Sequence, residues 1–167
     1  MTKEEKYTAC FREIDIRLEK GGHLIPDLGN IAAVLRKRMR FFWIGFYLVE
    51  GDRLILGPFQ GNPACVYIPF GQGVCGTCAE TGKTIMVDDV HDFPGHIACD
   101  PDSKSEIVVP LRDSSGKLRA VMDADSDREK GFDETDRTCL EKLARKMEPM
   151  WDSDSIFRGP EEGSGSR

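Results

Sequence analysis

Hydrophobic positions at the two ends of the chain recur with the spacing of a helix. Near the amino terminus, Tyr7, Phe11, Ile14 and Leu18 stand four, three and four residues apart, which places them on one helical face. Gly21-Gly22 predicts the end of this helix. The same spacing predicts a second helix from Asp27, after Pro26, and a closing helix capped by Asp133. Their core-facing positions are Leu28, Ile31, Ala32, Leu35 and Met39, and Leu140, Leu143, Ala144, Met147 and Trp151.

Between these helices the pattern changes to short apolar runs that are typical of strands. The predicted strands are 43–49, 53–59, 65–68, 84–87, 106–111 and 118–124. The first two flank the turn Glu50-Gly51-Asp52, and the last two flank a polar turn at 112–117, so both pairs predict hairpins.

Residues 70–104 are rich in glycine and proline, which predicts mostly loop, with a short helix near Thr77–Glu80. A loop of this length inside a compact domain usually binds something. Because helices and strands are segregated along the chain, we predict one α+β domain over residues 1–151, with an antiparallel sheet, helices packed on one side and the long loop over the other. The Ser-, Gly- and Glu-rich residues 152–167 predict a disordered tail.

Charge and composition narrow the class of protein. The 167 residues include 23 Lys and Arg against 29 Asp and Glu, a net charge of −6, which argues against a nucleic-acid partner. No apolar stretch is long enough for a membrane span, and the charged amino terminus is not a secretory signal. We therefore expect a cytoplasmic protein.

Four of the six cysteines lie in the middle of the chain. Cys75 and Cys78 form a Cys-x-x-Cys pair, which is a redox pair, half of a zinc site completed by His91 and His96, or a chance spacing. Cys99 lies in a loop that Pro94 and Pro101 stiffen, where its thiol either faces a ligand or packs under the loop. A protonated His96 would favour the Cys99 thiolate, and Asp100 would oppose it.

Acidic and aromatic side chains form a second candidate group. Asp123 and Asp125 are two residues apart on a predicted strand and therefore share a face, and Glu106 opens the neighbouring strand. They form a receptor for an ammonium group, a proton donor beside a reacting oxygen, or simply a solvated strand end. Trp43 and Tyr47 share a face of the first strand, either as core or as the wall of a site.

Taken together, these motifs resemble one family. In order along the chain they are Trp43-Ile44-Gly45-Phe46-Tyr47-Leu48, Ala64-Cys65-Val66, Gly73-Val74-Cys75-Gly76-Thr77, Gly95-His96-Ile97-Ala98-Cys99-Asp100, Ser105-Glu106-Ile107 and Asp123-Ala124-Asp125-Ser126. Over roughly residues 30–150 the chain resembles the free methionine-(R)-sulfoxide reductases, which are stand-alone GAF-domain enzymes.

The resemblance implies a GAF-like fold and a role for each matched residue. Cys99 would be the catalytic nucleophile, Cys65 the principal resolving thiol and Cys75 a secondary partner. Glu106, Asp123 and Asp125 would line the substrate pocket, and Trp43 would cover the substrate methyl group with Tyr47 nearby. Cys78, Cys10 and Cys139 match no cysteine of the family, so Cys78 leaves open which further disulfide forms.

The implied reaction is chemically consistent with these residue types. A thiolate attacks the sulfoxide sulfur while a carboxylic acid of raised pKa, for which Asp125 is a candidate, protonates the oxygen. The resulting Cys99 sulfenic acid would condense with Cys65 to a disulfide that thioredoxin reduces. No metal or organic cofactor is expected, and a homodimer through the terminal helices is plausible. The alternatives are a non-catalytic, small-molecule-sensing GAF module and a zinc-binding structural protein.

Overall fold

The computed structural model describes residues 1–19 and 22–152. Within them, six strands form one antiparallel sheet in the order β3-β2-β1-β6-β5-β4. The strands are β1 (Trp43–Glu50), β2 (Arg53–Gln60), β3 (Tyr67–Pro69), β4 (Ile85–Val87), β5 (Ser105–Arg112) and β6 (Leu118–Ser126). The helices are α1 (Lys3–Glu19), α2 (Leu24–Met39), α3 (Gly73–Thr81) and α4 (Glu134–Asp152), with a short 3-10 turn η1 (Val90–Asp92).

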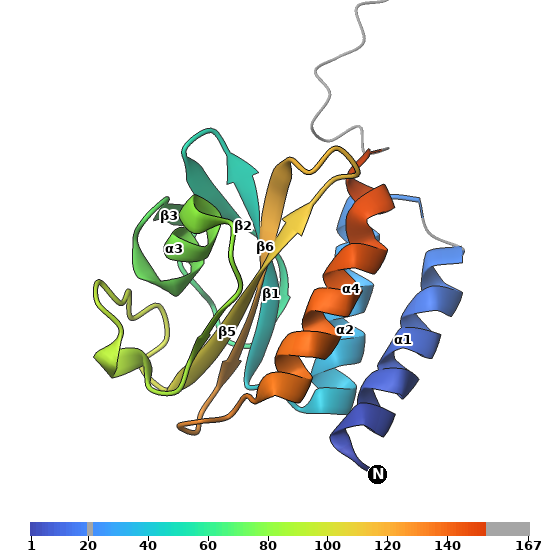
Figure 1. The fold of residues 1–167 in the computed structure, drawn as a ribbon, viewed down its shortest axis with the longest axis horizontal. Helices are drawn as coiled ribbons and strands as arrows, with labels where there is room; N and C mark the ends of the chain where they lie inside the picture. The colour runs from blue at the N-terminus through green and yellow to red at the C-terminus, as the bar shows by residue number, and fades with distance from the viewer. Residues whose placement is uncertain (20–21, 153–167) are drawn as a thin grey trace, which may run out of the picture.

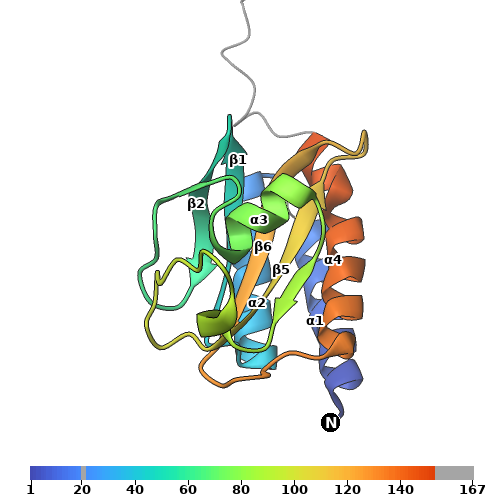
Figure 2. The same cartoon turned by 60° about the vertical axis from the view of Figure 1, so that its left-hand side comes forward.

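The sheet separates two unlike layers (Figures 1 and 2). Helices α2 and α4 lie on one face, and α1 packs outside them against α2. On the other face lie α3 and the loop that contains η1. The predicted α+β class, with an antiparallel sheet and helices on one side, is confirmed, and α3 is an additional short helix on the opposite face.

The helical layer forms where the sequence pattern predicted it. Leu28, Ile31 and Leu35 of α2 and Leu140 and Leu143 of α4 are almost completely buried against the sheet. The predicted cap of α4 is present, because the Asp133 carboxylate accepts hydrogen bonds from the backbone N–H groups of Thr135 and Asp136. Helix α2 begins at Leu24 and not at Asp27, because Pro26 is tolerated in a first turn whose N–H groups have no helical acceptor.

The opposite face is more regular than the glycine-rich sequence predicted. Residues 70–104 contain α3, the predicted strand β4 and η1, and α3 begins four residues before the predicted short helix near Thr77–Glu80. Val74, Cys78 and Ala79 bury one side of α3 against the sheet, so tertiary packing compensates for its low helix propensity. Strand β3 is shorter than predicted and does not include Cys65.

Two sequence predictions concern residues at the ends of the described segments. The predicted helix end at Gly21 and the predicted tail from residue 153 onward lie outside the described residues. Asp152 still belongs to α4. Among the helices described, none is sufficiently long and apolar to cross a lipid bilayer.

Candidate active site

The sheet pairing brings three acidic side chains together on the face opposite the helices. Glu106 of β5 lies opposite Asp125 of β6, and Asp123 lies opposite Val108 two residues away. Because alternate residues of a strand share a face, the three carboxyl groups project to the same side. Only 7, 6 and 8 % of Glu106, Asp123 and Asp125 is exposed, so this is a buried acidic cluster and not a solvated strand end.

Burial raises the pKa of each of these three carboxyl groups above its usual range. The charges of Asp125 and Glu106 raise the pKa of Asp123 further, and the charge of Glu106 also raises the pKa of Asp125. The Ser103 hydroxyl donates to Asp125 Oδ1 at 2.7 Å and partly offsets the rise there. Among the described residues, Asp123 Oδ1 is a buried oxygen with no hydrogen-bond partner. The cluster can therefore hold and deliver protons at pH values where exposed carboxyl groups are ionised.

An aromatic wall stands beside the acids. Trp43 of β1 is paired with Asp125, and its ring stacks on Phe59 at 5.3 Å and on Tyr47 at 6.1 Å between centroids. The indole Nε1 donates to the Asn62 carbonyl at 3.0 Å, which fixes the ring. Gly45 makes this possible, because a Cβ there would lie 2.5 Å from Trp43 Cη2. A glycine inside an aromatic strand is a signal of such a close approach, and the sequence reasoning did not use it.

Cys65 and Cys99 form a disulfide, with their Cα atoms 5.4 Å apart. The bond joins the segment before β3 to the proline-bracketed loop after η1. The Tyr47 hydroxyl donates to the Cys65 carbonyl at 3.2 Å, and Asn62 Nδ2 donates to Asp100 Oδ2 at 3.1 Å. Both sides of the disulfide are thus anchored, and Cys99 lines the pocket, as expected of a thiol that faces a ligand.

His96 lines the same pocket as Cys99. Burial, with a contribution from the charge of His91, lowers the pKa of its imidazole below the usual range. While Cys99 is held in the disulfide, the surroundings of His96 therefore favour its neutral form.

The Cys-x-x-Cys pair lies on α3, with its two thiols turned to different partners. Cys75 Sγ contacts Glu106 Oε1 at 3.7 Å, whereas Cys78 Sγ contacts the Val108 carbonyl at 3.7 Å. Both thiols are free and buried, and burial raises their pKa values, that of Cys78 to about 12. The zinc alternative with Cys75, Cys78, His91 and His96 as ligands is not supported, because within the described part of the chain the gathered ligand atoms belong to Cys75, Glu106 and Asp123.

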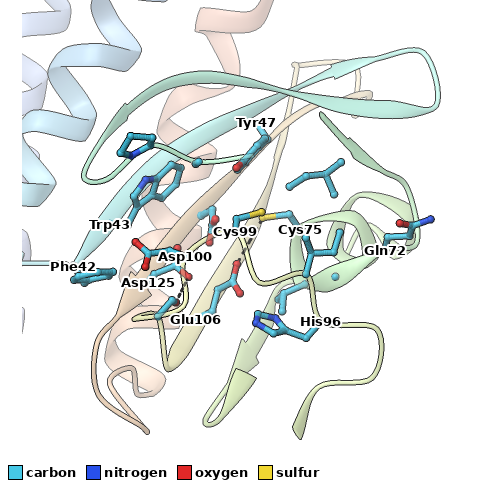
Figure 3. Close-up of a pocket in the computed structure, with 18 residues that line it drawn as sticks. Phe42, Trp43, Tyr47, Gln72, Cys75, His96, Cys99, Asp100, Glu106 and Asp125 are labelled. Carbon is cyan, nitrogen blue, oxygen red and sulfur yellow. Dashed lines mark hydrogen bonds between the residues drawn. The ribbon is translucent and has the colours of Figure 1, made fainter. Parts of the chain in front are cut away.

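The three acids, the aromatic wall, Cys75 and Cys99 line one pocket of about 570 Å³, a volume that includes its open mouth. Figure 3 shows Cys75, Cys99, Glu106 and Asp125 gathered at its centre, with Trp43 and Tyr47 on the β1 side. Cys65 contributes the disulfide, and the neighbouring Ala64 lines the wall. Sequence reasoning missed Phe42, Gln72 and Ser103 as lining residues, since nothing in their local pattern marks them.

Comparison with known proteins places the chain in a family. The model of the GAF domain matches residues 28–151. Free methionine-R-sulfoxide reductase of Escherichia coli is 41 % identical over 151 residues, 90 % of this chain and 91 % of that protein. The protein of the same name from Saccharomyces cerevisiae is 54 % identical over 106 residues, 62 % of this chain and 59 % of that one.

A solved structure agrees with these relatives. Free methionine-R-sulfoxide reductase from Neisseria meningitidis, in complex with its substrate, superimposes with a TM-score of 0.88 at 43 % identity and covers 92 % of both chains. The chain therefore belongs to the GAF domain family, in the group of the free methionine-R-sulfoxide reductases.

Proposed function

We propose that this protein reduces free L-methionine-(R)-sulfoxide to methionine. The observation that carries the proposal is the Cys65–Cys99 disulfide beside a pocket with three buried carboxyl groups and an indole wall. A redox-active cysteine pair supplies two electrons, and carboxyl groups of raised pKa supply protons, which are the two requirements of sulfoxide reduction. The names of the relatives add the identity of the substrate.

In the first half-reaction the Cys99 thiolate attacks the sulfoxide sulfur. Attack joins Cys99 Sγ to the substrate sulfur, and Asp125, whose pKa burial raises, donates a proton to the sulfoxide oxygen. The protonated oxygen then moves to Cys99 Sγ: an oxygen–Sγ bond forms, the bonds from the substrate sulfur to oxygen and to Sγ break, and methionine leaves. The oxygen remains on Cys99 as a sulfenic acid, and the sulfoxide sulfur has gained two electrons.

The second half-reaction closes the disulfide. The Cys65 thiol attacks the sulfenic sulfur of Cys99, a sulfur–sulfur bond forms, and water leaves with the oxygen and two protons. A dithiol reductant then exchanges with this disulfide and is itself oxidised to a disulfide. We assign that role to thioredoxin, and Cys75 remains a secondary exchange partner because it is a free thiol in the same pocket.

Substrate selection follows from charge and shape. Glu106 and Asp123 offer carboxylate oxygens to the ammonium of a free amino acid, and Asp123 Oδ1 has no other partner among the described residues. A methionine sulfoxide inside a peptide lacks that ammonium and would leave the buried acids unmatched. The indole of Trp43 offers an apolar surface to the methyl group, with Tyr47 beside it.

Two further parts of the proposal concern the setting of the enzyme. Thioredoxin dependence suits a cytoplasmic protein, in which disulfides are transient and catalytic. We also assign a homodimer to the terminal helices, of which α1 forms the outermost part of the helical layer.

The test is NADPH oxidation coupled through thioredoxin reductase and thioredoxin, with separated R and S free sulfoxides and a peptide-bound sulfoxide as substrates. We expect turnover of the free R form alone. Cys99→Ser should abolish it, while Cys65→Ser should keep a single turnover and lose most recycling. Cys139→Ser, which replaces a free thiol of α4 that does not line the pocket, is the matched control and should be unchanged. Binding of the sulfoxide without turnover would favour a sensing module instead.

A further inference from the structure

The acidic cluster also contains a thiol, and this combination does more than sulfoxide reduction requires. Ligand atoms of Cys75, Glu106 and Asp123 all lie within 4.8 Å of one another, and all three residues are buried. Asp123 is only 6 % exposed, lines the pocket, and has in Oδ1 a buried oxygen without a partner among the described residues. A buried acceptor without a donor is costly and indicates a cationic ligand.

The separation between the Cys75 and Glu106 donors is close to that between two ligands of one small metal ion. In a tetrahedral zinc site the metal lies about 2.3 Å from sulfur and about 2.0–2.2 Å from carboxylate oxygen, which puts those donors roughly 3.5 Å apart. Cys75 Sγ and Glu106 Oε1 are 3.7 Å apart. Small side-chain rotations would therefore complete the coordination from the observed positions.

We propose that Cys75, Glu106 and Asp123 form a binding site for a divalent, thiophilic cation of the Zn²⁺ class. Binding would release the thiol and carboxyl protons to solvent and would replace mutual repulsion of the acids by coordination to one cation. The thiolate selects Zn²⁺ against Mg²⁺ and Ca²⁺, which prefer oxygen ligands only. Three protein ligands leave one position open to water from the pocket.

The site is available while the proposed catalytic pair is oxidised. Cys75 remains a free thiol while Cys65 and Cys99 are joined in a disulfide. Because Asp123 and Glu106 also line the pocket, the cation and a pocket ligand exclude one another. The site therefore gives zinc a means to block the pocket without touching Cys99.

Cys78 provides a matched control on the same helix. It is as deeply buried as Cys75, but its sulfur is turned to the Val108 carbonyl and lies outside the donor group. Replacing either cysteine by serine removes one sulfur atom and changes little else in shape. A difference between the two variants therefore reports coordination and not the general loss of a thiol.

The experiment uses the full chain with the Cys65–Cys99 disulfide closed, Co²⁺ as the spectroscopic probe and Zn²⁺ as the competitor. We expect one Co²⁺ per chain with a thiolate-to-cobalt charge-transfer band in the near ultraviolet, which Zn²⁺ removes and excess Mg²⁺ does not. Cys78→Ser should keep the band. Cys75→Ser should lose it, and Glu106→Gln should weaken Zn²⁺ by at least the roughly 10–100-fold seen when a group that supports a metal ligand is removed.

The readout is binding, so it does not depend on the proposed catalysis, and circular dichroism verifies that each variant is folded. A band that survives in Cys75→Ser, or one that disappears in Cys78→Ser, would overturn the proposal. Absence of the band in the unaltered protein, or an equal response to Mg²⁺, would do the same.

Discussion

The two faces of the sheet bury their side chains equally well but with opposite chemistry. Ile107 and Met122 point from β5 and β6 into the helical layer, while their neighbours Glu106, Asp123 and Asp125 point into the pocket. Each fully buried apolar side chain contributes about 1.5–3 kcal/mol to stability, whereas burial of a carboxyl group opposes its ionisation. One face stabilises the fold, and the other holds protons ready for chemistry at some expense of stability.

The largest effect that would separate the two faces is expected at Asp125. Asp125→Asn preserves the shape and the contact with Ser103 but removes the proton that the proposed reaction needs. Turnover of free methionine-(R)-sulfoxide should fall by about 10²–10⁴-fold, the usual contribution of a general acid. The melting temperature should stay the same or rise, because a buried acid has been removed.

Asp127→Asn is the control for this change, since it removes a carboxylate two residues further on that is exposed. Its turnover should match that of the unaltered protein. If Asp125→Asn kept full turnover, the pocket face would lose its proposed role as the proton source.

On the helical face the effect should be on stability. Leu143 of α4 is completely buried in the apolar layer, so Leu143→Ala should lower the free energy of unfolding by about 2–5 kcal/mol. Turnover per folded molecule should be unchanged, because Leu143 does not line the pocket. Urea denaturation measures the first quantity, and the coupled assay at a temperature where both proteins are folded measures the second.

Ile25→Ala, at an exposed position in the first turn of α2, serves as the comparison and should change stability by less than about 0.5 kcal/mol. A loss of specific activity in Leu143→Ala would show that the two faces are not independent.

The apolar face could be predicted well from the sequence because its information is local. Spacings of three and four residues identified Leu28 and Leu143 as core, and the acidic turn after Asp133 identified the cap of α4. The alternation along a strand also predicted that Asp123 and Asp125 share a face, and a strand spacing of four gave the same for Trp43 and Tyr47.

The pocket face depends on contacts between distant segments, which local patterns do not contain. The pairing of Glu106 with Asp125, and the approach of Ser103 to Asp125, follow from the sheet register and a loop path. The glycine-rich α3 is stabilised by packing that its own sequence does not reveal. The roles assigned to Cys65 and Cys99 came from the family resemblance and not from their spacing alone.

A smaller effect should appear in the pH dependence of stability. The pKa of Asp123 is raised in the folded protein, so its contribution to stability is fully present below the pKa of the unfolded chain. That contribution is lost as the pH rises through the folded value. Asp123→Asn cannot ionise, so it does not lose stability in this way. Its free energy of unfolding, relative to that of the unaltered protein, should rise with pH by about 1.4 kcal/mol in total for each unit by which the folded pKa exceeds the unfolded one.

At Asp113 the dependence of stability on pH should have the opposite sign. The Ser115 hydroxyl, with backbone N–H groups and Arg119, lowers the pKa of its carboxyl group. Its contribution is therefore present above the unfolded pKa and lost as the pH falls through the folded one. Asp113→Asn should be destabilised at neutral pH and should approach the unaltered protein in acid. Equal slopes for the two variants would contradict the contrast between a buried cluster and a charged turn.

The smallest effect is expected at Ser103, which tunes the cluster without replacing an acid. Its hydroxyl donates to Asp125 Oδ1 at 2.7 Å and lowers the pKa of that carboxyl group relative to burial alone. Ser103→Ala should therefore raise the pKa of Asp125 further. Because the proposed reaction needs Asp125 protonated, turnover declines where the acid ionises, and that alkaline limb should move to higher pH in the variant.

A net hydrogen bond of about 0.5–1.5 kcal/mol corresponds to a shift of about one pH unit or less. Ser105→Ala is the matched control, because this neighbouring buried serine donates to the Arg128 carbonyl and leaves Asp125 untouched. In Ser105→Ala the alkaline limb of the pH–rate profile should stay at the same pH even if some stability is lost. If an ionised Asp125 were the active form, the acid limb would be the one that moves to higher pH in Ser103→Ala, and the cluster would then act as a base and not as a proton donor.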